Sequence, residues 1–269
     1  MNLSRVKAIV RKDLLELRAN KMAMMPMIIV PVVLCVVLPA VLTFLSLRLD
    51  ISAVNGAAFI ERMLPAYNIP AGFESTSAKI TYVFLNYVFV PFFLLVPVMV
   101  SSIVAANSVV GEKERKTLET LLYTPVTNRE FVLAKQLSAF LPAVIISLVS
   151  FVGYFIVVNG LSIALEGIWI VRSLMWIPAL LLVSPAASLL ALGVTLLISM
   201  RAKSFMEAQQ MSAVVVIPFI LLVLVQFTGI FVLSMLHVVI FGAVLLGIDL
   251  LLLNKIGPRF NREEIIKTL

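Results

Sequence analysis

Charged residues are scarce in this chain, and their scarcity decides its class. Asp, Glu, Lys and Arg make up 13% of the 269 residues, whereas 62% of the residues are hydrophobic. Soluble domains contain about 25% charged and about 45–50% apolar residues. A soluble fold of this composition would expose large apolar patches and aggregate. The composition therefore excludes a soluble domain and predicts an integral membrane protein with several spans.

Cysteine and histidine are almost missing, which limits the available chemistry. Cys35 is the only cysteine, so the chain cannot form an internal disulfide or a Cys/His metal site. Because Cys35 lies within an apolar run, we expect a buried free thiol. His237, the only histidine, is expected to be a satisfied polar residue near the outer membrane face. Asp249 is the only acid well inside a predicted span, and such a carboxylate is a functional candidate.

The sequence does not indicate an enzyme. A protease within the membrane needs a Ser/His pair, paired carboxylates or a metal-binding cluster, and one histidine with one aspartate supplies none of these. Asp249 could instead reach the membrane rim, because it precedes Lys255 by only six residues. We therefore expect no catalytic residue, no metal and no cofactor in this chain. The alternative, an intramembrane enzyme, predicts an activity that depends on His237 or Asp249.

Long apolar runs predict six transmembrane helices. A spanning helix needs about 20 mostly apolar residues. The last run, 211–253, would extend about 65 Å as one helix, twice the hydrocarbon thickness, so it must turn near Gln226–Gly229. The first run is much longer than the apolar core of a signal peptide, about 7–15 residues, and is expected to be retained. The predicted spans are 22–47, 82–110, 137–158, 173–200, 211–227 and 233–253.

The basic residues predict the orientation of these spans. Of the 21 Lys and Arg residues, 17 lie before the first span, in the 111–137 loop, after the fourth span or in the tail 254–269. The positive-inside rule places these segments in the cytoplasm, with both chain termini. The same placement accounts for the net charge of +7 without a nucleic-acid partner. We expect a multi-pass protein of the cell membrane.

Residues 1–20 carry a helical pattern of their own. Apolar residues recur at intervals of three and four, which predicts one apolar face formed by Leu3, Val6, Val10, Leu14 and Leu17. The charged residues lie largely elsewhere: Arg5, Lys12, Asp13, Glu16 and Arg18. A basic amphipathic helix of this kind favours the membrane interface. The alternative is a cytoplasmic helix that packs on the rest of the protein.

The segment 111–136 is the densest charged stretch in the chain. Gly111 is placed to end the second span, and 112–123 predicts a short helix whose charges face water. Within it, Glu112 and Lys116 have the spacing of a favourable ion pair. Pro125 disfavours a helical conformation at the residue before it and ends the element. Three leucines share one face of the predicted helix: Leu118, Leu121 and Leu122.

The end of this segment predicts a helix start. Thr127 and Glu130 have the spacing of a capping box, and Val126 with Phe131 has that of a hydrophobic staple. The loop is thus predicted to contain a projecting helix, a sharp turn and a capped entry into the third span. The alternative is an elbow that only returns the chain to the membrane.

The string GEKERKTLETLLYTPVTNREFVLAK resembles the signature loop of ABC type-2 exporter permeases. The matching residues are Gly111, Glu112, Lys113, Glu114, Arg115, Thr117, Glu119, Leu121, Leu122, Thr124, Pro125 and Val126. Lys116 stands where glycine is common in that family. The segment 199–210 is similar to the family's second cytoplasmic loop, and the topology is similar over the whole chain.

The resemblance implies a permease dimer that works with two ATP-binding-cassette ATPase subunits. The expected partner within the dimer is a second copy of this chain. In such permeases the helix after the second span docks on the ATPase. Here this coupling helix corresponds to Glu112, Lys113, Glu114, Arg115, Thr117, Leu118, Glu119, Leu121 and Leu122. The chain lacks the G-x-x-x-x-G-K-[ST] phosphate loop. ATP and Mg²⁺ are therefore expected on a separate polypeptide.

The substrate is less constrained than the energy source. The near absence of charge in the spans favours export of an apolar or amphipathic substrate. Permeases that extrude sodium share the signature loop, so an ion is an alternative. A scaffold that binds a soluble partner through the loop and moves nothing is another.

Overall fold

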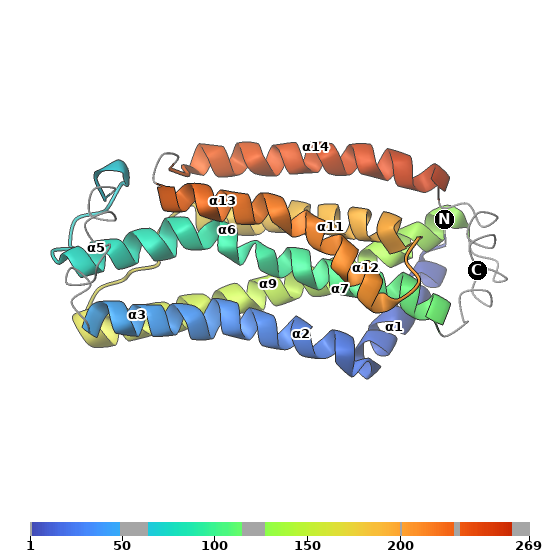
Figure 1. Ribbon diagram of the computed structural model, residues 1–269, viewed down its shortest axis with the longest axis horizontal. Helices are drawn as coiled ribbons and strands as arrows, with labels where there is room; N and C mark the ends of the chain where they lie inside the picture. The colour runs from blue at the N-terminus through green and yellow to red at the C-terminus, as the bar shows by residue number, and fades with distance from the viewer. Residues whose placement is uncertain (1, 49–63, 115–126, 200, 229–231, 260–269) are drawn as a thin grey trace.

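The computed structural model describes residues 2–48, 64–114, 127–199, 201–228 and 232–259. These residues form helices and contain no strand, which confirms the predicted all-α class. Six helical segments are long and apolar enough to cross a membrane, as predicted. They lie side by side in an elongated bundle (Figure 1).

Most spans are built from several helical pieces. The first consists of α2 (Lys21–Val32), η1 (Val33–Val37) and α3 (Leu38–Arg48), and the second of α5 (Thr76–Val83), η4 (Phe84–Val88), α6 (Phe89–Phe93) and α7 (Leu95–Glu114). A short 3₁₀ helix, η3 (Leu64–Ala66), precedes the second span. The third span is α9 (Asn128–Glu166). The fourth joins α10 (Trp176–Pro178), η5 (Ala179–Val183) and α11 (Ser184–Ser199).

The last two spans follow a short connection. The fifth contains α12 (Phe205–Ser212), η6 (Ala213–Val216) and α13 (Ile217–Thr228), and the sixth is α14 (Met235–Arg259). The helical ranges exceed several predicted spans, most of all α9, which begins before 137 and continues past 158. The prediction that Gly111 ends the second span is wrong, because α7 continues to Glu114.

The second span is the axis of the bundle. In its most hydrophobic stretch 83% of the residues are buried, against 22% in the first and sixth spans. Its last helix, α7, packs mainly against α11 and α9. The first and sixth spans lie at opposite margins of the view in Figure 1. Movement of the second span therefore affects the whole core, whereas α14 can move with less disturbance.

The end of the bundle away from α1 (Leu3–Ala19) is fixed by buried amides. Gly167 ends α9 in a left-handed conformation, with φ of 69°, which glycine adopts at little cost. The chain then returns to the bundle, where the Asn159 side chain accepts hydrogen bonds from the Ile170 and Val171 amides at 3.1 and 2.9 Å. Asn86, in η4, donates to the Ile170 carbonyl at 2.9 Å. These hydrogen bonds hold residues 170–171 against the bundle at the end away from α1.

Helix α1 lies across the other end of the bundle, where α14 also ends (Figure 1). Its buried stripe contains Val6, Ile9, Asp13 and Leu17, and it packs chiefly on the start of α9. The predicted apolar face of α1 is therefore only partly exposed, because Leu3 is exposed whereas Val6 and Leu17 are buried against the rest of the protein. The structure accordingly favours the alternative of a helix packed on the protein, at least along this stripe.

Candidate functional site

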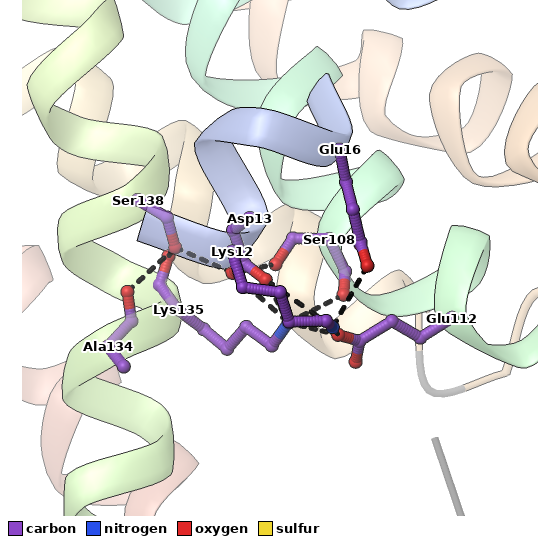
Figure 2. A network of polar contacts seen from close by, with 8 residues as sticks. All are labelled: Lys12, Asp13, Glu16, Ser108, Glu112, Ala134, Lys135 and Ser138. Atoms are coloured by element: carbon purple, nitrogen blue, oxygen red, sulfur yellow. Dashed lines mark hydrogen bonds and ion pairs between the residues drawn. The ribbon is translucent and has the colours of Figure 1, made fainter. Parts of the chain in front are cut away.

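Seven polar residues meet beneath α1, directly beside the 111–136 loop. This charge cluster comprises Lys12, Asp13 and Glu16 of α1, Ser108 and Glu112 of α7, and Lys135 and Ser138 of α9 (Figure 2). Three helices that are distant in sequence thus share one polar junction. Asp13, Glu112 and Lys135 are buried, with exposed fractions of 3%, 1% and 0%.

Lys135 is the centre of the charge cluster. Its Nζ donates to both carboxylate oxygens of Asp13 at 3.0 and 3.1 Å and to Glu112 Oε1 at 2.9 Å. It also donates to the carbonyl oxygen of Ser108 at 2.8 Å. An ammonium group has three protons and accepts nothing, so four nearby acceptors saturate it. A buried charge is tolerated when it is paired and hydrogen-bonded in this way.

Asp13 is equally well provided with partners. Its Oδ2 accepts from Ser108 Oγ at 2.7 Å and from Ser138 Oγ at 2.8 Å, in addition to Lys135. Ser138 also donates to the carbonyl oxygen of Ala134 at 2.7 Å, as one of its alternative partners. The carboxylate of Asp13 on α1 is therefore bound by donors from both α7 and α9. Loss of Asp13 would remove one acceptor from donors on α7 and α9.

Lys12 extends the charge cluster toward solvent. It forms an ion pair with Glu112 and lies 3.4 Å from Glu16. Partial burial lowers the pKa of Lys12, but the carboxylates of Glu112, Glu16 and Asp13 raise it, and the net direction is upward. Lys12 is therefore protonated at neutral pH. Glu112 thus has two lysines as partners, one from α1 and one from α9.

The three carboxylates of the charge cluster are close enough to hold a metal ion. Asp13, Glu16 and Glu112 each offer an oxygen within 4.8 Å of the others. However, the ammonium groups of Lys12 and Lys135 already bind these oxygens. A metal would have to displace both lysines, one of which is fully buried. The chemistry of the cluster is that of a fixed junction between helices.

Other bonds tie both ends of the 111–136 loop to the bundle. At its start, Glu114 Oε1 accepts from the Phe205 amide at 2.9 Å and so binds the first turn of α12. At its end, Thr127 and Glu130 form the predicted capping box at the start of α9, which is confirmed. Glu130 also accepts from the Asn2 amide at 2.6 Å. Four helices, α1, α7, α9 and α12, therefore converge on this loop.

The structure corrects one part of the predicted coupling helix. Glu112 was expected to face water, but it is buried and binds Lys12 and Lys135. Its predicted partner Lys116 lies outside the described residues. The burial of Glu112 follows from the continuation of α7 through Gly111. Lys113 and Glu114 belong to the last turn of α7. The remaining predicted residues lie outside the described part of the chain: Arg115, Thr117, Leu118, Glu119, Leu121 and Leu122.

Sequence reasoning missed Asp13 and Lys135, although a signal for each exists. Asp13 continues the three- and four-residue spacing of Val6, Ile9 and Leu17, so it belongs to the same face as these apolar residues. Lys135 stands among apolar residues at the start of a span. A charged residue in each of two apolar faces suggests that the two pair.

The two predicted intramembrane polar residues do not meet. They lie twelve positions apart on α14, about 18 Å along the helix axis. His237 is exposed in the first turn of α14, and its Nδ1 lies 2.8 Å from Ser234 Oγ. Asp249 is 4% exposed, and neither of its oxygens has a hydrogen-bond partner among the described residues. The structure therefore brings together no pair of residues for intramembrane catalysis in the described part of α14.

The six apolar helices and the charged junction at one end define a multi-pass α-helical membrane protein. A family model described as ABC-2 family transporter protein matches residues 7–255, which include most of α1, the charge cluster, the first five spans and most of α14. The chain belongs to this family, as the signature loop predicts, and is a membrane transport subunit. No curated protein matches the sequence.

Proposed function

We propose that this chain is the permease subunit of an ABC exporter that is driven by a separate ATPase docking on residues 112–122. ATP and Mg²⁺ bind the ATPase, and two permease copies form the pathway. The α1 end of the bundle, where α14 also ends, faces the cytoplasm. The observation that carries the proposal is the convergence of four helices on the signature loop.

The charge cluster gives the loop a mechanical connection to the spans. Both Glu112 and Lys135 lie within the 111–136 loop, and Lys135 follows Thr127 by eight residues. Glu112 and Lys135 bind each other at 2.9 Å, and Lys135 binds Asp13 of α1. A displacement of the loop is therefore transmitted to α7, α9 and α1 together, because these helices share buried ion pairs. Rigid connected elements of this kind carry energetic coupling between distant sites.

The bond from Glu114 adds a route to the fifth span. Its carboxylate binds the Phe205 amide at the first turn of α12, where a negative charge is also favoured by the helix dipole. Ser204 caps the same turn through the Glu207 amide at 3.1 Å. The fifth span therefore starts from a position that the signature loop controls. Coordinated movement of the second, third and fifth spans suits alternating access.

The composition of the spans supports an apolar or amphipathic substrate. Their interior is closed by apolar and aromatic residues, such as Phe89, Phe93, Tyr154 and Trp176, which are all buried. Extrusion of sodium or another ion is the second candidate, since the signature loop is shared by such permeases. The presence of one buried, unpartnered carboxylate, Asp249, is the observation that favours it.

The proposal is tested by association with a candidate ATP-binding-cassette ATPase, sought first in the neighbouring reading frames. The double variant Arg115→Ala with Glu119→Ala changes the predicted docking helix without touching Glu112 or Glu114, whose side chains bind the bundle. We expect co-purification of the ATPase to fall about tenfold or more, which corresponds to about 1.4 kcal/mol of binding free energy. Glu74→Ala, an exposed change at the opposite end of the bundle, is the control and should have no effect.

Unchanged association in the double variant would overturn the docking assignment. Association without stimulation of ATP hydrolysis and without vectorial transport in vesicles would support the scaffold alternative. ATP-driven sodium movement by reconstituted vesicles would support the ion alternative, and movement of a fluorescent lipid would support the proposed substrate class.

A further inference from the structure

Asp249 is a buried carboxylate without a compensating partner among the described residues. It lies within α14, in the membrane-spanning part of the helix, and is 4% exposed. Neither Oδ1 nor Oδ2 has a hydrogen-bond partner among the described residues. Buried carboxylates in folded proteins are normally paired or hydrogen-bonded. The isolation of Asp249 therefore requires an explanation.

Among the described residues, the helices that pack against α14 place no opposite charge within hydrogen-bond distance of Asp249. α14 contacts mainly α11 and η5, and the whole stretch 179–199 contains no ionisable residue. α10, which makes fewer contacts, contains none either. The described charged side chains of α9 lie near its ends: Glu130, Lys135 and Glu166. The remaining ionisable group of α9, the Tyr154 hydroxyl, donates to the Leu85 carbonyl at 2.8 Å. On α14 itself, His237 is about 18 Å away along the axis, and the side chains of Lys255 and Arg259 lie outside the described set.

The contact between α14 and the fourth span is close. A Cβ atom placed on Gly242 would lie 2.7 Å from Leu182 Cγ and 3.2 Å from Val183 Cγ2. Small residues permit such close approach of helices within a membrane. Seven residues, almost two turns, separate Gly242 from Asp249, so the carboxylate lies on the same face of α14. The close packing therefore encloses Asp249.

An ionised carboxylate enclosed by apolar helices in a bilayer is strongly disfavoured. A proton removes the charge and needs no protein partner. We propose that Asp249 is a proton-binding site, neutral while α14 packs against α11 and ionised when α14 separates from it. The step is reversible binding of one proton by the carboxylate, and no other bond changes.

The position of α14 makes this separation feasible. Its most hydrophobic stretch is only 22% buried, so it can leave α11 without opening the core around the second span. Because the ionised carboxylate is stable only in contact with water, loss of the proton favours the separated arrangement. Rising pH should therefore weaken the α11–α14 contact. This inference goes beyond the proposed docking of an ATPase and does not depend on it.

Infrared spectroscopy of the purified full chain in lipid nanodiscs tests the proton site. At about pH 7, exposed carboxyl groups are ionised, so the carbonyl band of a protonated carboxylic acid should report Asp249. We expect this band in the wild-type chain and its loss in both Asp249→Asn and Asp249→Leu. A wild-type band that is unchanged in both variants, or no band at all, would overturn the proposal.

Spin labels test the link to helix packing. Exposed Leu181 of η5 and exposed Ile240 of α14 can be replaced by labelled cysteines in a Cys35→Ala chain. We expect the distance between the labels to increase as pH rises through the range where the infrared band disappears, and to be independent of pH in Asp249→Asn. If the distance between the labels does not change with pH in the otherwise unaltered chain, the link between Asp249 protonation and the α11–α14 contact is overturned. The ATPase-docking proposal would be unaffected.

Discussion

The charge cluster and Asp249 bury the same chemical group in opposite ways. Asp13 and Glu112 are 3% and 1% exposed and are bound by two lysines, whereas Asp249 is 4% exposed with no partner among the described residues. The first arrangement fixes three helices at the end of the bundle that carries the signature loop. In the second arrangement, α14 at the margin of the bundle carries a carboxylate that is neutralised by a proton in the arrangement we propose. The comparison separates a rigid junction from a movable contact.

The largest expected effect comes from Lys135→Met. The substitution preserves the length of the side chain but leaves Asp13 and Glu112 close together without the shared ammonium group. Breaking a buried ion pair by removal of one partner costs about 3–5 kcal/mol. We expect a loss of this size in the free energy of unfolding in lipid or detergent.

Lys203→Met is the matched control for this substitution. Lys203 is an exposed lysine at the same end of the bundle, and an exposed change of this kind alters stability by less than about 0.5 kcal/mol. Equal effects of the two substitutions would show that the charge cluster does not contribute as a unit.

Asp13→Asn should have a smaller effect than Lys135→Met. Lys135 keeps Glu112 as a partner, and the amide can still accept from Ser108 or Ser138. We expect a loss of about 1–3 kcal/mol. In a double-mutant cycle the losses of Asp13→Asn and Lys135→Met should fall short of additivity by about 0.5–3 kcal/mol. Additive losses would mean that the two residues act independently.

Thr127→Ala tests the junction at the other end of the signature loop. Removal of an N-cap side chain costs about 1 kcal/mol. Ser75→Ala removes the N-cap of α5 at the opposite end of the bundle, where Ser75 Oγ accepts from the Ala78 amide at 3.1 Å. Both changes should lower the melting temperature alike, but only Thr127→Ala should weaken association with the ATPase. If both substitutions changed association with the ATPase equally, the end of the loop at Thr127 would have no specific role in docking.

Asp249→Asn should change stability least. The carboxylate is already neutral under the proposed arrangement, and asparagine has almost the same shape. We expect the free energy of unfolding at neutral pH to change by less than about 1 kcal/mol. A loss as large as that of Lys135→Met would place Asp249 in an ion pair and abolish the contrast between the two regions.

The sequence was sufficient where local rules decide the outcome. Five apolar runs, the last divided at its polar break, become six candidate spans, and the Thr127–Glu130 spacing becomes a capping box. It was insufficient for Glu112, because the burial of that residue depends on Lys12 and Lys135, which lie 100 and 23 positions away. Gly111 was misassigned for a related reason. Glycine ends a helix when nothing continues it, but here packing of α7 against α9 and α12 holds the next turn in place.

The burial of Asp13 likewise could not be predicted from the local sequence alone. The periodicity places it on the buried face of α1, yet its charge argued for solvent. Only the location of Lys135 on α9, 122 residues away, makes its burial favourable. Pairing between distant residues is a property of the assembled bundle and is not encoded in local spacing.

We infer that the charge cluster connects the proposed docking segment 112–122 to the spans, so that loss of Lys135 weakens docking of the ATPase. The deciding measurement is the dissociation constant between the chain in nanodiscs and a candidate ATP-binding-cassette ATPase, for the wild type and for Lys135→Met at equal helical content. The account predicts tight binding by the wild type and binding at least about tenfold weaker by the variant, a difference of about 1.4 kcal/mol. No binding by the wild type, or equal binding by both, would contradict it.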